Sequence, residues 1–579
     1  MRRRTFVRGL ASLALAPVAM SLSSCGAPQG DASPADASPD AAQPAEVLFS
    51  HDPGAYAEPA IDLGMSNENG NPVVFTTDGS VPTASSARAK ETVRVDASDT
   101  NAQLIELLAA EVPDWRSLSV RDDLPTATVI RAAELAPDGT LGPDGANTYF
   151  MGTDLGELYG QDMIVISIVA DPHDLLDPET GIMAMGTMYE EHRAENEEAM
   201  AQNRSADVVA NYTQSGRDWE RPARIQAFDR SNQLSFEIPC GIRLRGNDSR
   251  KYSQKSFNVY FRSDYGQKRL EYPLFGEDNV DAQGTVIDSY KGFSLRAGGN
   301  ATELMSFRDS LYQQQVRDYA IATQATRPAI AYLNGEFYGL YSLNEKYSGA
   351  YVESHYGVAD ENVVIFEQGK LDEGVDDDVV LYEELMAFGD RDLSDEAAWE
   401  EFLEAVDNES MVDYYAIQAY LGNVDCNDKL NTRVWRAREP EDGNPFGDTR
   451  WRWMLYDIEF SSCLYGVDQT QPQYDTLAMM MEKTRLLKAA MRNESFRGMM
   501  RERLVDLGTG PLSAETMTRA IDETWALWEP WMSLTCLRFC NRWNEIEGDR
   551  DGARWFFSER FEHILDNFDR LAEELAAGA

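Results

Sequence analysis

Acidic and amide side chains flank two predicted strands in the second half of this 579-residue chain. Asp425 and Asn431 precede a predicted strand at residues 432–436, and Asp457 directly follows another at residues 451–456. Phosphoryl transfer needs one carboxylate to orient the acceptor hydroxyl, and a second carboxylate with an amide oxygen to hold a divalent metal on the phosphates. Because acids beside neighbouring strands can face one cleft, we predict catalysis by Asp425 and a metal site at Asn431 and Asp457.

Glu459 extends this candidate metal site. It lies two residues after Asp457 and offers a further carboxylate as an additional ligand. The competing interpretation is structural, with these acids only capping the ends of strands.

A turn of small residues marks the other half of the candidate site. A predicted strand ending at Arg245 leads into Gly-Asn-Asp-Ser at residues 246–249, and the next predicted strand carries Lys255 among alternating apolar and polar neighbours. Backbone amides in such a turn, with an ammonium beside them, suit a phosphate group. Either feature alone is a weak signal, because most turns of this kind are only turns.

These motifs, taken in order, resemble the CotH (spore coat protein H) kinase-like family. Gly-x-x-x-x-Gly-Asn-x-Ser-Arg spans residues 241–250, Lys-Ser-Phe follows at 255–257, Asn-x-Asp stands at 423–425, and Asp-x-Glu ends a Trp-rich strand at 457–459. The resemblance implies an α+β fold whose main body is an atypical, two-lobed protein kinase. It also implies that the protein binds ATP together with Mg²⁺ or Mn²⁺ as cofactors.

The resemblance assigns roles in the first lobe. Arg245, Ser249 and Lys255 would bind the nucleotide, and Lys255 would contact its phosphates as part of the catalytic set. Asp309 is the candidate acidic partner of Lys255. Glu345 would lie in the hinge beside the base.

One spacing departs from ordinary protein kinases. The interval from Asp425 to Asn431 is one residue longer than their Asp-x-x-x-x-Asn. Asn427 therefore stays open as an alternative metal ligand.

The amino terminus predicts export and a lipid anchor. A basic start and an apolar stretch at residues 10–22 make residues 1–25 a signal peptide. Its Arg-Arg pair resembles a twin-arginine signal, and its Leu-Ser-Ser-Cys ending resembles a lipobox at which Cys25 is acylated. A permanent transmembrane helix is the weaker alternative, because the stretch is short for ~30 Å of hydrocarbon. Residues 26–46 are mostly Ala, Pro, Asp and Ser, and this composition predicts a disordered linker.

Residues 47–150 predict a small Ig-like β-sandwich. Thr-x-Asp-Gly-Ser-x-Pro-Thr at residues 76–83 resembles a turn of chitobiase-type Ig-like modules, and its Asp78-Gly79 pair suits a tight turn with positive φ. Two roles stay open, a spacer and a module that binds cell-wall glycan.

The rest of the chain divides into three predicted parts. They are a β-rich lead-in at 151–236, a kinase-like core at 237–470 and a helical carboxyl-terminal part of the same body at 471–579. In the last part, apolar periodicity predicts helices at residues 477–491, 494–507, 514–527 and 558–575.

Composition excludes several function classes. The chain has 52 Lys plus Arg against 98 Asp plus Glu, a formal charge of −46, which disfavours nucleic acid as a partner. No CxxC, HxH or HExxH spacing supports a zinc site, and no GxSxG elbow supports a serine hydrolase. Cys536 and Cys540 are spaced to share one helix face, which suits packing better than metal capture.

We therefore predict a surface enzyme, anchored in the cell membrane through Cys25 and facing outward, that transfers phosphate from ATP to Ser or Thr of another exported protein. Two alternatives stay open. One is a non-catalytic, pseudokinase-type protein of surface interaction or envelope assembly, and the other is transfer of the nucleotide instead of phosphate.

Overall fold

The computed structural model describes residues 45–97, 101–112, 117–160, 163–196 and 208–577. The predicted signal peptide with Cys25, and nearly all of the predicted linker, lie outside the described residues. The described part mixes helices and strands, so the α+β class is confirmed. The likeness of its parts to an Ig-like sandwich and to two kinase lobes stays a prediction.

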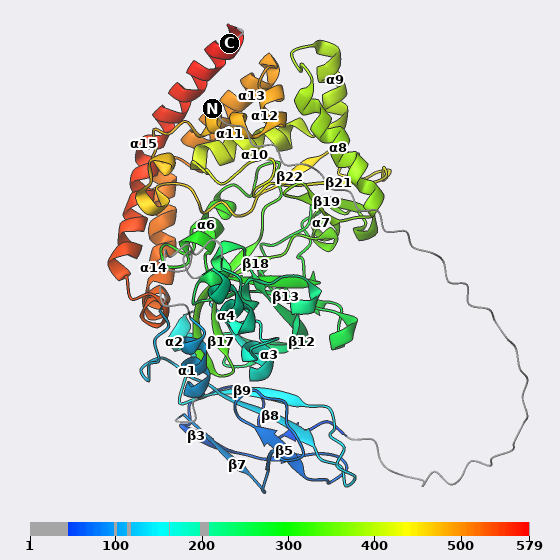
Figure 1. The fold of residues 1–579 in the computed structure, drawn as a ribbon, viewed down its shortest axis with the longest axis vertical. Coiled ribbons are helices and arrows are strands. Elements are labelled where there is room, and N and C mark those ends of the chain that lie inside the picture. Colours follow the sequence, from blue (N-terminus) through cyan, green and yellow to red (C-terminus); the bar gives the residue numbers. More distant parts are fainter. Residues whose placement is uncertain (1–44, 98–100, 113–116, 161–162, 197–207, 578–579) are drawn as a thin grey trace, which may run out of the picture. The chain divides into compact units, whose positions relative to one another are not determined.

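Short sheets make up the first folded segment, drawn in blue and cyan in Figure 1. The strand orders are β2-β9-β8-β5-β6, β3-β7 and β1-β4. Leu63, Val95 and Tyr149 are fully buried in its core. The elements are β1 (Leu48–Phe49), β2 (Gly54–Tyr56), β3 (Ala60–Leu63), β4 (Met65–Ser66), β5 (Val73–Thr76), β6 (Ala87–Arg88), β7 (Val93–Asp96), α1 (Ala102–Ala110), β8 (Thr128–Glu134) and β9 (Gly145–Met151).

The Asp78-Gly79 turn of this segment contacts the next one. Gly79 has a φ of +87°, the left-handed backbone that the turn motif predicts. The Asn334 amide donates to the carbonyls of Asp78 (3.0 Å) and Ala170 (2.8 Å). A Cβ at Gly79 would lie 2.4 Å from the Asn334 side chain, so the close approach requires glycine. The turn thus docks the β segment onto the Asn334 turn.

A closed barrel follows, in the strand order β10-β11-β12-β13-β16-β18-β17. Closure leaves no unpaired strand edge. Along β12, Ile242 and Leu244 belong to the buried core, whereas Arg243 and Arg245 alternate with them on the outer face. The barrel strands are β10 (Ile164–Ala170), β11 (Arg221–Phe228), β12 (Leu234–Arg245), β13 (Ser256–Tyr260), β16 (Gly292–Arg296), β17 (Thr326–Leu333) and β18 (Glu336–Glu345).

The predicted boundary at residues 236/237 is wrong. It falls inside β12, and β10 and β11 pair within the same barrel as the strands of the predicted core. β10, β11 and the start of β12, all within residues 151–236, are therefore strands of the barrel rather than a lead-in. Alternation of apolar residues identifies a strand, but it does not say with which strand that one pairs.

Smaller elements connect and flank the barrel strands. Asn334 lies in the tight turn between the antiparallel strands β17 and β18. Between residues 302 and 319, α6 is the one regular α-helix. These elements are α2 (Leu155–Tyr159), α3 (Pro172–Leu176), α4 (Gly186–Glu195), β14 (Leu270–Glu271), β15 (Ser289–Tyr290), α6 (Arg308–Gln315) and α7 (Gly349–Tyr356).

The second half of the chain is a small antiparallel sheet surrounded by helices. The sheet order is β20-β19-β21-β22, with β19 (Val363–Glu367), β20 (Lys370–Glu373), β21 (Arg433–Ala437) and β22 (Arg452–Met454). The helices are α8 (Val379–Ala387), α9 (Glu396–Ala405), α10 (Asn408–Leu421), α11 (Thr476–Lys483), α12 (Arg485–Ala490), α13 (Glu494–Thr509), α14 (Ala514–Phe539) and α15 (Trp543–Ala576).

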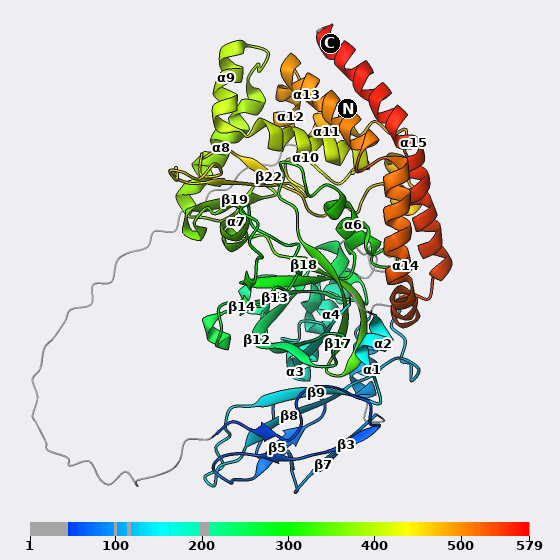
Figure 2. The ribbon, with the colours of Figure 1, turned by 180° about the vertical axis from the view of Figure 1, so that it is seen from behind.

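The carboxyl-terminal helices differ from the predicted ones in length. The helix predicted at 477–491 is split at Thr484, which has an extended backbone, into α11 and α12. By contrast, α14 and α15 are longer than predicted and run side by side past the barrel (Figure 1, Figure 2). The Thr535 hydroxyl accepts the Leu340 N–H at 2.9 Å, so α14 is bonded to β18.

A buried arginine on α15 ties the end of α10 in place. The fully buried Arg560 side chain donates to the carbonyls of Ala419 (2.5 Å) and Tyr420 (3.0 Å) at the end of α10, and to that of Tyr474 (2.9 Å). Burial lowers the pKa of Arg560 to about 10. Because α10 leads directly into the segment with Asp425, the hydrogen bonds of Arg560 also help to fix the position of that segment.

We expect Arg560→Met to lower the free energy of unfolding by about 3 kcal/mol or more, because several buried carbonyls lose their donor at once. Arg570→Met, an exposed change on the same helix, is the matched control and should shift stability by less than ~1 kcal/mol. Chemical denaturation of both variants checks this, and equal losses would contradict the role given to Arg560.

Candidate active site

A cavity of about 480 Å³ brings together residues from the barrel and from the second half of the chain. The outer faces of β12, β13 and β16 supply Arg245, Asn258 and Arg296. The turn at residues 246–249 also lines the cavity. Of the predicted site residues, the cavity is lined by Arg245, Ser249, Asp425, Asn431, Asp457 and Glu459.

Asp425 lies in the segment between α10 and β21. Gly422, in a left-handed conformation, ends α10, and the Asn423 side chain then accepts the Asp425 N–H at 3.0 Å. The Asn431 amide donates to Asp425 Oδ2 at 3.2 Å. Burial raises the pKa of Asp425, and the nearby charge of Asp457 raises it further. The carboxylate is thus held in place beside its predicted metal-binding neighbours.

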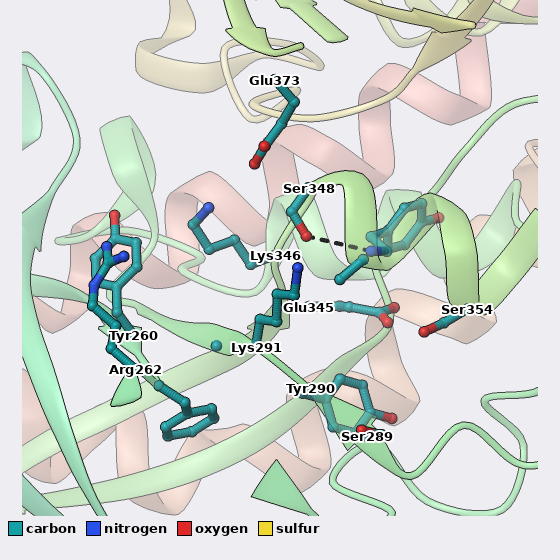
Figure 3. A pocket seen from close by; sticks show the side chains of 14 residues that line it. Tyr260, Arg262, Ser289, Tyr290, Lys291, Glu345, Lys346, Ser348, Ser354 and Glu373 are labelled. Carbon is teal, nitrogen blue, oxygen red and sulfur yellow. Dashed lines mark hydrogen bonds between the residues drawn. The ribbon is translucent and has the colours of Figure 1, made fainter. Parts of the chain in front are cut away.

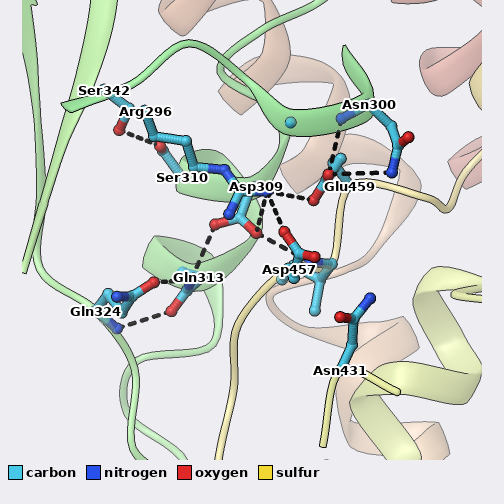
Figure 4. A network of polar contacts seen from close by, with 12 residues as sticks. Arg296, Asn300, Asp309, Ser310, Gln313, Gln324, Ser342, Asn431, Asp457 and Glu459 are labelled. Carbon is cyan, nitrogen blue, oxygen red and sulfur yellow. Dashed lines mark hydrogen bonds and ion pairs between the residues drawn. The ribbon is translucent and has the colours of Figure 1, made fainter. Parts of the chain in front are cut away.

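Asn431 and Asp457 share an uncommon backbone conformation. Their φ angles are +50° and +57°, in the left-handed region that residues with a Cβ seldom occupy. Both residues line the cavity, and both are labelled in Figure 4. Backbone strain of this kind costs on the order of 1–3 kcal/mol per residue and is concentrated at functional sites.

A single guanidinium connects three acids from distant segments. Arg296 Nη2 lies 2.6 Å from Asp457 Oδ1, 2.5 Å from Glu459 Oε2 and 3.7 Å from Asp309 Oδ2 (Figure 4). Arg296, Asp309 and Glu459 are almost fully buried. Burial raises the pKa of Glu459, and the charges of Asp457 and Asp309 add to this against the opposing effect of Arg296. For Asp457, the charges of Arg296 and Arg245 outweigh burial and lower the pKa.

Asp309 does not pair with Lys255, contrary to the prediction. Its carboxylate accepts the Ile458 N–H at 2.9 Å and the Gln313 amide at 2.9 Å, and its nearest ion-pair partner is Arg296. Asp309 therefore supports the segment that carries Asp457 and Glu459.

Lys255 itself does not line the cavity. Its ammonium donates to the Arg250 carbonyl at 2.6 Å and lies 3.9 Å from the centre of the Tyr212 ring. The Lys255 side chain thus stabilises the end of the 246–251 segment through the hydrogen bond to Arg250. The structure does not place it where phosphates would contact it.

Glu345 lies in a neighbouring cavity of about 180 Å³, shown in Figure 3. It ends β18, and both of its carboxylate oxygens lie 3.0 Å from His355 Nε2. Lys346, the next residue, lines both cavities. The structure therefore brings Lys346, rather than Glu345, to the larger cavity.

Two cations of the cavity lack a bonded acid. The Arg245 side chain has no hydrogen bond or ion pair among the described residues, although Arg296 and Asp457 lie near enough to affect its pKa. Burial and the charge of Arg296 lower the pKa of Arg245. Lys346 likewise forms no ion pair with a carboxylate in the described part, and its ammonium lies 5.4 Å from the centre of the Tyr260 ring. Unpaired cations held together in a cavity favour binding of an anion.

Sequence reasoning missed Arg296 and Lys346. The signal for Arg296 was available, since it ends a strand, Gly292–Arg296, whose other positions are apolar or small. A charged residue at such a position needs a buried partner. Nothing in the local sequence identifies the partners, which come from residues more than a hundred positions away.

The oxygen donors of the cavity suit Mg²⁺ or Mn²⁺. No cluster of three or more His, Cys, Asp or Glu side chains in the described ranges is arranged to hold a metal ion. Mg²⁺, however, is usually bound by one or two carboxylates together with water and substrate phosphates. Asp457, whose side chain is 33% exposed, and the Asn431 amide oxygen fit this pattern. Glu459 is less suited to bind a metal ion, because its oxygens already accept hydrogen bonds from Arg296 and from the Asn300 N–H (3.0 Å).

Comparison with known proteins gives one family. No curated protein matches the chain. The family described as CotH kinase protein matches residues 242–547, from the end of β12 to the first turns of α15. The match contains every residue of the cavity named above.

Proposed function

Because the chain belongs to the CotH kinase protein family, we propose that it is an exported, atypical protein kinase that transfers phosphate from ATP to Ser or Thr of another exported protein. The observation that carries this proposal is the composition of the cavity. One wall presents the unpaired Arg245 and the turn at 246–249, and another presents Asp425, Asn431 and Asp457. Its volume of about 480 Å³ is within the range of small-molecule and cofactor sites, ~300–1,000 Å³.

Each residue then has a separate task. Arg245 and the amides of the turn bind phosphate oxygens, and Asp457 with Asn431 holds the divalent cation. When bound, Mg²⁺ or Mn²⁺ supplies positive charge that neutralises the phosphates. Asp425 orients the acceptor hydroxyl and accepts its proton, as a positioned general base does. Lys346 is placed to contact the nucleotide at the end of the cavity nearer the smaller one.

A non-catalytic role is the second candidate, and one observation favours it. Arg296 already forms ion pairs with Asp457 and Glu459, so these acids have a structural function without any metal. A pseudokinase-type surface protein would keep this ion-pair cluster. It would have no need for the unpaired Arg245 or for Asp425.

The test uses the purified chain with ATP labelled at either the γ- or the α-phosphate, with Mg²⁺ or Mn²⁺, and a Ser/Thr peptide mixture as acceptor. Label transferred only from the γ-position supports the kinase. Transfer of the α-label identifies a nucleotidyl transferase. Metal-dependent binding of ATP without transfer favours the non-catalytic candidate. If the chain does not bind ATP, the kinase and the nucleotidyl-transferase proposals are both wrong.

The proposed phosphate contact predicts a selective effect of Arg245→Ala. Nucleotide affinity should fall by ~10-fold to ~100-fold, since a hydrogen bond to a charged group contributes about 1.5–3 kcal/mol. Arg243→Ala is the matched control, because Arg243 lies on the same face of β12 but pairs with Glu220 outside the cavity. Calorimetry with ATP and Mg²⁺ measures both, and equal affinities of the two variants would contradict the contact.

Cys25 is the proposed membrane anchor, although it lies outside the described residues. The described helices include none that is both long and apolar enough to cross a bilayer. We expect Cys25→Ala to move the protein from the membrane fraction to the soluble fraction of cells that express it. Fractionation and immunoblotting give the readout, and a variant that stays with the membranes would contradict the anchor. Binding of cell-wall glycan by the β segment remains a proposal that glycan pull-down can test.

A further inference from the structure

Two thiols meet at the end of α14, and neither lines the candidate active site. Cys540 Sγ lies 2.9 Å from Cys536 Sγ and donates a hydrogen bond to it. In a regular helix these positions are one turn apart. Here Cys540 leaves the helical conformation as the cap residue (φ −135°), and Asn541 follows with φ +53°. The chain turns back, and the turn brings the two sulfurs together.

The surroundings stabilise a thiolate at one of the two positions. Cys536 Sγ accepts a hydrogen bond from Cys540 and another from the Arg542 N–H, at 3.1 Å. These donors hold the pKa of Cys536 below its ordinary value. The other described cysteines differ, since burial raises the pKa of Cys240, Cys426 and Cys463. The pair thus combines a stabilised thiolate with a second thiol in contact with it, as reactive cysteine pairs do.

The pair lies at the corner between α14 and α15, which contacts other parts of the molecule. The Phe539 ring packs against that of Tyr338 in β18 at 5.4 Å, and Arg542 forms an ion pair with Glu303. Glu303 is three residues after Asn300, whose N–H bonds Glu459 in the candidate active site. The corner between α14 and α15 therefore contacts both the barrel and the segment beside the cavity.

We propose that Cys536 and Cys540 form a dithiol site that is oxidised to an intramolecular disulfide by an external disulfide compound. One thiolate attacks the external disulfide, forming a mixed disulfide and releasing one external thiol. The second thiolate then attacks the mixed disulfide at the protein sulfur, closing the Cys536–Cys540 bond and releasing the second external thiol. Two protein thiols lose two electrons and two protons, and one external disulfide is reduced to two thiols. The sulfurs must approach by less than ~1 Å to reach the ~2.05 Å of an S–S bond.

The test treats the folded, full-length chain with oxidised glutathione, and then adds denaturant, because Cys536 is itself buried. The free thiols are blocked with iodoacetamide, and the peptides are mapped by mass spectrometry. We expect the peptide with Cys536 and Cys540 to lose two hydrogens and to escape alkylation. Reduction with dithiothreitol should restore two alkylatable thiols. In Cys536→Ser and Cys540→Ser, the remaining cysteine should carry glutathione or be alkylated.

Two outcomes would overturn the proposal. In one, both cysteines are fully alkylated after oxidation of the parent, and in the other a stable mixed disulfide remains on one of them. Cys240, Cys426 and Cys463 serve as internal controls, because they are buried and, among the described residues, have no partly exposed thiol such as Cys540 beside them, so they should stay reduced and be fully alkylated. This test does not depend on nucleotide binding, so its result is independent of the proposed kinase.

Discussion

Asp457→Asn is expected to abolish metal-dependent nucleotide binding. Of the three acids around Arg296, Asp457 is the most exposed, and it lines the same cavity as Asn431. Loss of a residue that merely orients a metal ligand typically costs 10–100-fold in affinity, so loss of the ligand itself should exceed ~100-fold. Binding of ATP without metal should change much less, because Arg245 and the turn remain.

The control for this variant is Asp428→Asn. Asp428 lies in the same part of the molecule and is half-buried, but it accepts the Arg485 N–H (3.1 Å) and does not line the cavity. Calorimetric titration of ATP with and without Mg²⁺ gives the comparison. If Asp457→Asn binds Mg²⁺ and ATP as the parent does, Asp457 acts only as the ion-pair partner of Arg296.

Asp425→Asn is expected to separate binding from chemistry. The amide keeps the size of the side chain and an oxygen that can accept the Asn431 hydrogen bond (3.2 Å), so ATP and metal should bind nearly as in the parent. It cannot accept the proton of the acceptor hydroxyl. The rate of transfer should fall by on the order of 10² to 10⁴, the usual contribution of a positioned base.

The label-transfer assay measures the rate of transfer, and calorimetry on the same preparation measures the binding of ATP and metal. Asp428→Asn again serves as control and should transfer phosphate at the parental rate. If Asp425→Asn and Asp457→Asn both bind and transfer like the parent, the kinase proposal fails and the non-catalytic candidate takes its place. If Asp425→Asn loses binding and transfer together, Asp425 acts in ground-state binding rather than as a base.

The acidic half of the site was predictable from the chain alone. Asp425, Asn431 and Asp457 lie at the ends of predicted strands, and side chains at neighbouring strand ends tend to meet. Arg245 and Ser249 were found with them, because a strand leading into a turn of small residues is visible in the sequence. All five line one cavity in the structure.

The basic half was not predictable to the same degree. Lys255 has the expected alternating neighbours, yet its ammonium bonds the Arg250 carbonyl and lies over Tyr212. The direction of a long side chain depends on what packs around it, and Tyr212 comes from a segment about forty residues earlier. Arg296 instead occupies the centre of the acidic cluster, and its partners there come from segments more than a hundred residues away.

The sequence by itself determined the α+β class, most of the elements near the site, and the residue types suited to phosphate and metal, because these follow from local patterns with periods of two and 3.6 residues. Only the tertiary structure decided which strands close the barrel, that β10 and β11 belong to it, and that Arg296 rather than Lys255 pairs with Asp309. These arrangements depend on contacts between residues far apart in the chain. Such contacts are selected by packing and by burial of charge, which no local pattern records.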